Sequence, residues 1–153
     1  YVSLWVYASL APALLTNFRT LAVFSVWMGG MCVLSLGIFW LFPTAVPPAD
    51  IDWSRYPQMA IIKDADAGGN ACPSLHVAAA VFSALWLDRA FRNVGAPLVL
   101  RSLSALVCLA ILWSTVATRQ HVVLDVLAGT LVGTAFAVFS LRHARAFGGS
   151  QEI

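Results

Sequence analysis

The chain has little charge: only 10% of its 153 residues are Asp, Glu, Lys or Arg, whereas 60% are hydrophobic. Soluble domains carry about 25% charged residues and about 45–50% apolar ones. A chain of this composition has too little polar surface to face water on all sides. The shortage of charge therefore argues against an ordinary soluble domain and predicts an integral membrane protein.

The chain also has few cysteines and a small net charge. The chain has three cysteines, an odd number, and two of them lie inside apolar runs, so no disulfide framework is predicted. A net charge of +2 does not indicate a nucleic-acid partner. No charged segment and no small-residue cleavage site accompany the first apolar run, which argues against a signal peptide and suggests that an upstream helix is missing.

Long apolar runs separated by short polar turns fill most of the chain. We expect membrane spans within residues 1–15, 21–42, 75–91, 98–118 and 122–141. The second run has 22 residues without a charge, close to the roughly 20 that cross a bilayer. These runs predict an all-α, polytopic transmembrane bundle of five spans, or six with a missing N-terminal helix. We expect one domain over residues 1–145, with an extracytoplasmic loop at 43–73 and a cytoplasmic tail at 146–153.

The arginines predict the orientation of this bundle. With five spans, six arginines fall on one side of the membrane: Arg19, Arg89, Arg92, Arg101, Arg142 and Arg145. The side with more arginine and lysine faces the cytoplasm in membrane proteins. We therefore expect a multi-pass protein of a bacterial inner membrane, whose arginine-poor side faces the periplasm.

Two polar clusters begin apolar helices on that outer side. Pro73-Ser74-Leu75-His76 opens the third run, and His121 with Asp125 opens the fifth. Amide groups at a helix head, together with the helix dipole, attract anions. Ionisable groups in membrane helices are costly and are therefore candidates for function. If the two heads meet, they would form a phosphate site with two histidines.

The spacing of the second cluster suggests its chemistry. His121 and Asp125 are four residues apart and share one helical face. An Asp that accepts the Nδ1–H of a His leaves Nε2 as a nucleophile or base, and His76 would supply a general acid. Two alternatives stay open: a metal site built from the two histidines and the carboxylate, and a non-enzymatic membrane scaffold, which leaves Asp125 unexplained.

These clusters resemble two motifs of the type 2 phosphatidic acid phosphatase/haloperoxidase superfamily. Pro73–His76 is similar to its Pro-Ser-Gly-His motif. Ser114 and Thr115, followed by His121 and Asp125, are similar to its Ser-Arg-x5-His-x3-Asp motif. The resemblance covers residues 73 to about 133, together with the order and length of the helices.

The resemblance implies a role for each matched residue. His121 would be the nucleophile that takes the phosphoryl group, and Asp125 would orient it. His76 would be the general acid, and Ser74 would bind the phosphate. No metal or other cofactor is implied.

The chain departs from the family pattern at its cations. Leu75 stands where the motif has Gly, Thr115 stands where it has Arg, and no Lys-x6-Arg-Pro motif precedes residue 73. Phosphoryl transfer needs positive groups around the equatorial oxygens. Arg119 and Lys63 are the candidates for phosphate binding on the outer side.

The implied activity is a phosphatase for a lipid phosphate monoester or pyrophosphate. The sequence Pro-Ser-Leu-His, together with Arg-Gln-His-x3-Asp-Val, resembles the motifs of the inositol phosphorylceramide synthase branch. Enzymes of that branch transfer a phospho-head group to an alcohol. A transferase of the inositol phosphorylceramide or sphingomyelin synthase type is therefore an alternative. The expected partners are a lipid phosphate, the bilayer and, for the transferase, a lipid or polyol alcohol.

Overall fold

The computed structural model describes residues 2–47 and 69–147, which form five helices and no strand. The helices are α1 (Val2–Ala13), α2 (Phe18–Leu41), α4 (Leu75–Asn93), α5 (Leu98–Ala117) and α6 (Val123–Phe147). Three of them, α2, α5 and α6, are long and apolar enough to cross a membrane. The predicted all-α class with membrane-spanning helices is therefore confirmed.

The other two helices meet the requirements of a span less fully. α1 has 12 residues, which at 1.5 Å per residue gives about 18 Å, shorter than a hydrocarbon core of about 30 Å. α4 has 19 residues, and Asp88, Arg89 and Arg92 lie in its last turns. The crossing of the membrane by these two helices stays a prediction.

Local signals account for the ends of the helices. Asn17 caps α2, since its Oδ1 accepts a hydrogen bond from the Arg19 amide at 2.8 Å, and so the helix starts inside the polar turn expected at residues 16–20. α2 ends at Leu41, two residues before Pro43, as the proline predicts. α6 runs beyond the expected end of its span, because residues 142–147 contain no proline or glycine to stop it.

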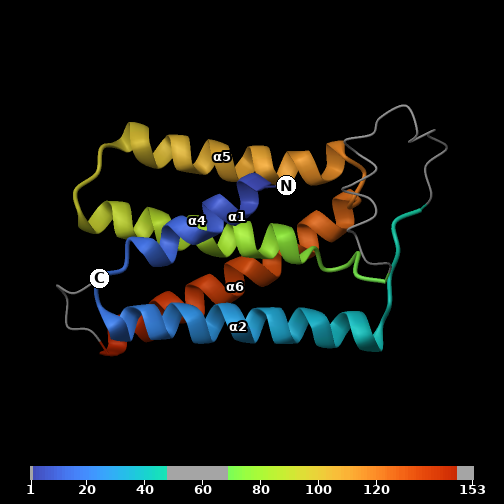
Figure 1. The fold of residues 1–153 in the computed structure, drawn as a ribbon, viewed down its shortest axis with the longest axis horizontal. Coiled ribbons are helices and arrows are strands. Elements are labelled where there is room, and N and C mark those ends of the chain that lie inside the picture. The colour runs from blue at the N-terminus through green and yellow to red at the C-terminus, as the bar shows by residue number, and fades with distance from the viewer. Residues whose placement is uncertain (1, 48–68, 148–153) are drawn as a thin grey trace.

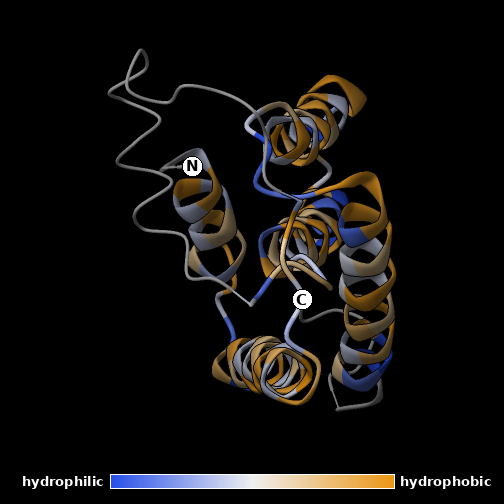
Figure 2. Cartoon of the chain, turned by 90° about the vertical axis from the view of Figure 1, so that its right-hand side faces the viewer, coloured by the Kyte–Doolittle hydropathy of each residue, from blue (hydrophilic) through white to orange (hydrophobic). Residues whose placement is uncertain are grey.

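α4 lies at the centre of the bundle, with the other helices around it (Figures 1 and 2). It packs against α1, α2, α5 and α6. Phe82 and Trp86 of α4 meet Phe24 of α2 edge to face, with ring centroids 5.2 and 5.4 Å apart. Trp86 also donates from Nε1 to the Ser140 hydroxyl of α6 at 2.9 Å. The polar edge of this buried ring is thus satisfied inside the bundle.

Two glycines let α4 and α6 approach closely. A Cβ atom placed on Gly129 would lie 2.5 Å from the carbonyl oxygen of Ser74, and one on Gly133 would come closer still to that of Ala78. Only hydrogen fits at these two positions of α6. Gly129 and Gly133 are four residues apart, which is the small-xxx-small pattern of closely packed membrane helices, and their contact brings the heads of α4 and α6 together.

The opposite end of the bundle is rich in arginine. Asp88 near the end of α4 accepts from Nε of Arg92 at 2.8 Å and from Nε of Arg101, on α5, at 2.7 Å. α4, α5 and this ion-pair cluster therefore meet at the end where the tail of α6 also lies (Figure 1). The arrangement agrees with the distribution of arginines along the sequence, while the orientation in the membrane stays a prediction.

Candidate active site

The heads of α4 and α6 bring two histidines together. The ring centroids of His76 and His121 are 6.0 Å apart, with the planes inclined by 55°. His121 is buried, with 6% of its surface exposed, and His76 is half-buried. Two residues 45 positions apart in the chain therefore lie side by side at the heads of α4 and α6.

A backbone carbonyl holds the His121 ring. Its Nδ1 lies 3.0 Å from the carbonyl oxygen of Ala71, within hydrogen-bond distance. A carbonyl oxygen can only accept, so Nδ1 is the donor in this contact, and in a neutral ring the lone pair then lies on Nε2. The four-residue spacing predicts Asp125 as the acceptor, but the carboxylate Oδ2 is 3.7 Å from Nδ1, beyond a hydrogen bond.

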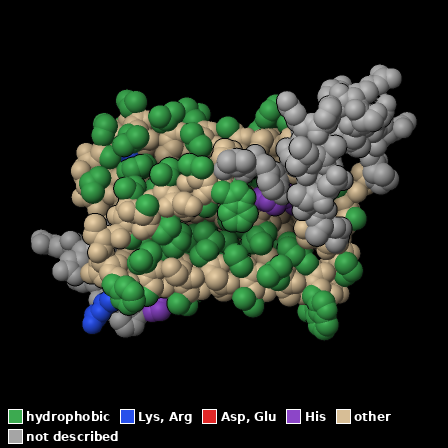
Figure 3. Space-filling view, in the orientation of Figure 1, with side chains coloured by type: hydrophobic (Ala, Val, Ile, Leu, Met, Phe, Trp, Pro, Cys, Tyr) green, Lys and Arg blue, Asp and Glu red, His purple; other side chains and the backbone are tan. Residues whose placement is uncertain are grey.

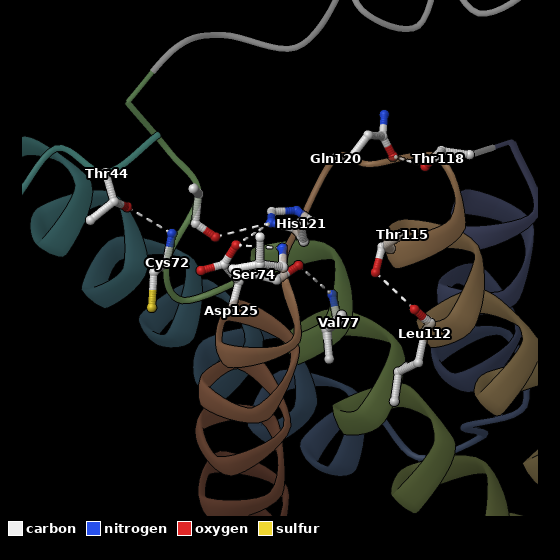
Figure 4. A network of polar contacts seen from close by, with 12 residues as sticks. Thr44, Cys72, Ser74, Val77, Leu112, Thr115, Thr118, Gln120, His121 and Asp125 are labelled. Atoms are coloured by element: carbon white, nitrogen blue, oxygen red, sulfur yellow. Dashed lines mark hydrogen bonds and ion pairs between the residues drawn. The ribbon is translucent and has the colours of Figure 1, made fainter. Parts of the chain in front are cut away.

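Asp125 instead connects the two helix heads (Figure 4). Its Oδ2 accepts from the Val122 amide at 2.9 Å, so it caps α6, and its own carbonyl accepts from the Ser74 amide at 3.1 Å. The carboxylate is buried and offsets the positive end of the α6 dipole. It also lies near enough to His121 to stabilise a positive charge on that ring.

Ser74 is the N-cap of α4. Its Oγ accepts from the Val77 amide at 3.3 Å, its carbonyl accepts from the Ala78 amide at 2.9 Å, and the residue is fully buried. Amides in the first turn of a helix, before the first intrahelical bond, are suited to an anion. Direct binding of phosphate by the Ser74 hydroxyl stays a prediction.

Thr115, which stands where the motif has arginine, has a structural role in the turn between α5 and α6. Thr115 is buried, and its hydroxyl donates to the Leu112 carbonyl at 2.8 Å, away from the histidines (Figure 4). Its carbonyl accepts from the amides of Gln120 and His121, both at 3.1 Å. Thr115 therefore shapes the turn that presents His121 and supplies no charge.

The two predicted cations lie in different parts of the chain. Arg119 is exposed in the same turn, at a φ of 52°, which is uncommon for a residue other than glycine. Lys63 and most of the loop at residues 43–73 lie outside the described residues. The phosphate-binding roles of Arg119 and Lys63 stay predictions.

An apolar groove of 820 Å³ leads to the histidines. It lies between α1, α2 and α4, with His76 and His121 in its wall. Leu75, the residue in place of the motif glycine, lines it beside them. Its other apolar walls include Leu4, Trp5, Phe24, Met28, Leu36 and Trp40. Figure 3 shows histidine surface on this face of the molecule, bordered by hydrophobic side chains.

Residues 2–47 and 69–147 contain no assembled site for the metal alternative. Within these ranges no three His, Cys, Asp or Glu side chains form a group that could hold a metal ion. One carboxylate oxygen of Asp125 is bound to the Val122 amide.

Cys72 offers a test of the membrane orientation. It is partly exposed beside the site. Cys108 of α5 is buried, and Cys32, which is also partly exposed, lies within α2, a helix suited to span the membrane. We expect a membrane-impermeant maleimide to label Cys72 from the arginine-poor side of sealed cells or vesicles and to leave Cys32 and Cys108 unmodified. Mass spectrometry of the labelled peptides would identify the site.

The rate of this labelling should depend on pH. Burial raises the pKa of the Cys72 thiol, and the negative charge of Asp125 raises it further. The reactive thiolate is therefore scarcer at neutral pH than in an ordinary cysteine, and labelling should accelerate as the pH rises. A Cys72→Ser variant is the control. Labelling from the arginine-rich side alone would contradict the orientation.

A family model described as the PAP2 superfamily matches residues 1–139. No curated protein and no solved structure matches the chain. The matched family does not distinguish the inositol phosphorylceramide synthase branch from others, so that finer resemblance stays a prediction. Because the match covers nearly the whole chain, including both histidine clusters, the chain belongs to the PAP2 superfamily.

Proposed function

We propose that the protein is an integral membrane phosphatase that hydrolyses a lipid phosphate monoester or pyrophosphate through a phosphohistidine on His121. One observation carries the proposal: two histidines face each other, 6.0 Å apart between ring centroids, in the wall of an apolar groove. The superfamily supports a phosphatase or phosphotransferase activity in general. The groove supports a substrate with an apolar tail.

The first chemical step would form the phosphohistidine. Nε2 of His121 attacks phosphorus, the nitrogen–phosphorus bond forms, and the bond between phosphorus and the lipid oxygen breaks. Protonated His76 gives its proton to that leaving oxygen. The Ala71 carbonyl keeps the proton of His121 on Nδ1, so that Nε2 is the nucleophilic atom.

The second step would release the phosphate. Neutral His76 takes a proton from a water molecule, whose oxygen attacks phosphorus while the nitrogen–phosphorus bond breaks. His121 returns to its neutral form, and His76 is again protonated. With a lipid phosphodiester as the donor and an alcohol in place of water, the same two steps would transfer the phospho-head group to that alcohol, which is the head-group transferase reaction.

The negative charge that develops on phosphorus oxygens needs donors. Amides in the first turn of α4 are candidates by helix geometry. Arg119 and Lys63 are the side chains that we propose to complete the charge balance. The negative charge of Asp125, at the head of α6, would repel the phosphate and so acts against these cations. It favours a positive charge on the His121 ring.

Product analysis tests the proposal directly. The purified protein is incubated with a panel of lipid phosphates, with and without lipid or polyol alcohols. We expect inorganic phosphate in the absence of an alcohol. A new phosphate ester of the added alcohol, which is a phosphodiester when the donor in the panel is a lipid phosphodiester, would favour the transferase. No reaction with any member of the panel would contradict both activities and favour the scaffold.

Vanadate and a chelator separate the phosphohistidine route from a metal route. Vanadate can adopt the trigonal-bipyramidal shape of phosphoryl transfer, so a site complementary to that transition state should bind it more tightly than phosphate. We therefore expect vanadate to inhibit turnover and excess chelator to leave it unchanged. Activity that is lost with chelator and restored by zinc or magnesium would support the metal alternative.

A further inference from the structure

Thr44 lies outside every motif and yet is bonded to the segment that holds His121. It follows the end of α2 and forms an isolated parallel bridge with Asn70. The Thr44 amide donates to the Gly69 carbonyl at 3.3 Å, and the Thr44 carbonyl accepts from the Ala71 amide at 3.1 Å. Its Oγ1 accepts from the Cys72 amide at 2.8 Å. One residue therefore holds the backbone of residues 69–72 at three points.

The bond to the Cys72 amide has a particular geometry. The Ala71 carbonyl and the Cys72 amide belong to one peptide unit, which is planar. The N–H of this unit points to Thr44 Oγ1, and its C=O points to Nδ1 of His121 (Figure 4). Rotation of the plane would break both hydrogen bonds. The Thr44 hydroxyl thus fixes the direction of the carbonyl that binds His121.

We propose that Thr44 is a positioning residue for His121. By holding the 71–72 peptide plane, its hydroxyl keeps the proton of His121 on Nδ1 and leaves the lone pair of Nε2 available. Without this anchor the carbonyl can turn away from His121. The tautomer with its proton on Nε2 then becomes populated, and in that tautomer Nε2 has no lone pair with which to attack phosphorus. The consequence for turnover rests on the proposed function, whereas the consequence for the tautomer does not.

Two substitutions at one position test the proposal. Thr44→Val keeps the shape of the side chain and both backbone hydrogen bonds and removes only the acceptor for the Cys72 amide. Thr44→Ser keeps that acceptor. Loss of a group that orients a metal-bound histidine costs about 10–100-fold in metal affinity or activity, and we take the same order of magnitude for a catalytic histidine. We expect Thr44→Val to lower kcat by about this factor with KM little changed, and Thr44→Ser to restore it.

The nitrogen-15 spectrum of the histidine rings provides a readout that a merely structural role would not move. The His121 signals, assigned by their loss in His121→Ala, should report a proton on Nδ1 in the native protein and in Thr44→Ser. In Thr44→Val they should shift toward the other tautomer. Thr134→Val, on the exposed side of α6, is the control for a threonine-to-valine change and should leave spectrum and kcat unchanged.

The outcomes separate the proposal from the enzyme assignment. A native His121 tautomer and a native kcat per folded molecule in Thr44→Val would overturn the role of Thr44, even if that variant were less stable. A shifted tautomer in a protein that turns over no phosphorylated lipid would support the role of Thr44 and contradict the phosphatase.

Discussion

Replacing His121 by alanine should abolish turnover. The substitution removes the only atom placed to attack phosphorus in the proposed route, and the His76 acid then has no bond cleavage to assist. Loss of a nucleophile in other covalent enzymes lowers kcat by about 10⁶-fold, so we expect activity at the background of the assay. Release of phosphate from a lipid phosphate, measured per folded molecule, is the appropriate test.

Two further histidine variants serve as controls for this result. His143 also lies on α6, but at the other end, where its Nδ1 accepts from Nε1 of Trp27 at 3.1 Å. His143→Ala should therefore remain active. His76→Ala should still form the intermediate from a substrate with a good leaving group, such as a nitrophenyl phosphate, because no proton is then required. An acid-labile phosphoprotein that His121→Ala fails to form would support the route; unimpaired His121→Ala activity would eliminate it.

Gly129→Ala should separate the two histidines without touching either. The new methyl group would lie 2.5 Å from the Ser74 carbonyl oxygen and 3.1 Å from Cβ of Val77. The first neighbour is backbone at the head of α4, so the helices must move apart. A misplacement of about 1 Å can cost about 100-fold in rate, and overpacking costs about 1–3 kcal/mol in stability. Turnover and the thermal unfolding midpoint in detergent measure the two effects.

Gly29→Ala is the matched control for this experiment. Gly29 lies within α2, and a Cβ atom there meets no other atom within 4 Å. Alanine is favoured over glycine in a helix by up to about 1 kcal/mol, so this variant should be as active as the native protein and at least as stable. Full activity of Gly129→Ala would show that the distance between the helix heads is not critical for the reaction.

The features that were predictable from the sequence depend on local patterns. The apolar run before Pro43 gives α2, and the polar residues that open α4 and α6 mark both helix heads. Since short turns make successive helices antiparallel, His76 and His121 had to lie at the same end. The glycine pair of α6 indicated a close contact, although not that its partner would be α4.

The remaining features depend on packing that no local pattern encodes. Inside a membrane an apolar side chain is satisfied by lipid or by protein alike, so the runs did not show that α4, with Phe82 and Trp86, is the buried centre. Ala71 contacts His121 through its backbone carbonyl, and the identity of its side chain gives no sign of this contact. The anchoring of that carbonyl by Thr44 depends on a contact between segments 25 to 28 residues apart in the chain.

The apolar groove also bears on how a substrate would arrive. Trp5 and Trp40 line it and are 67% and 83% exposed, so its walls reach the outer surface of the bundle, where α2 is suited to span the membrane. A lipid could then enter sideways, by diffusion within the plane of the bilayer, and its acyl chains would stay among hydrocarbon throughout. For such an enzyme the effective concentration is the mole fraction of substrate among membrane lipids. Inert lipid would dilute the substrate, and a larger volume of buffer would not.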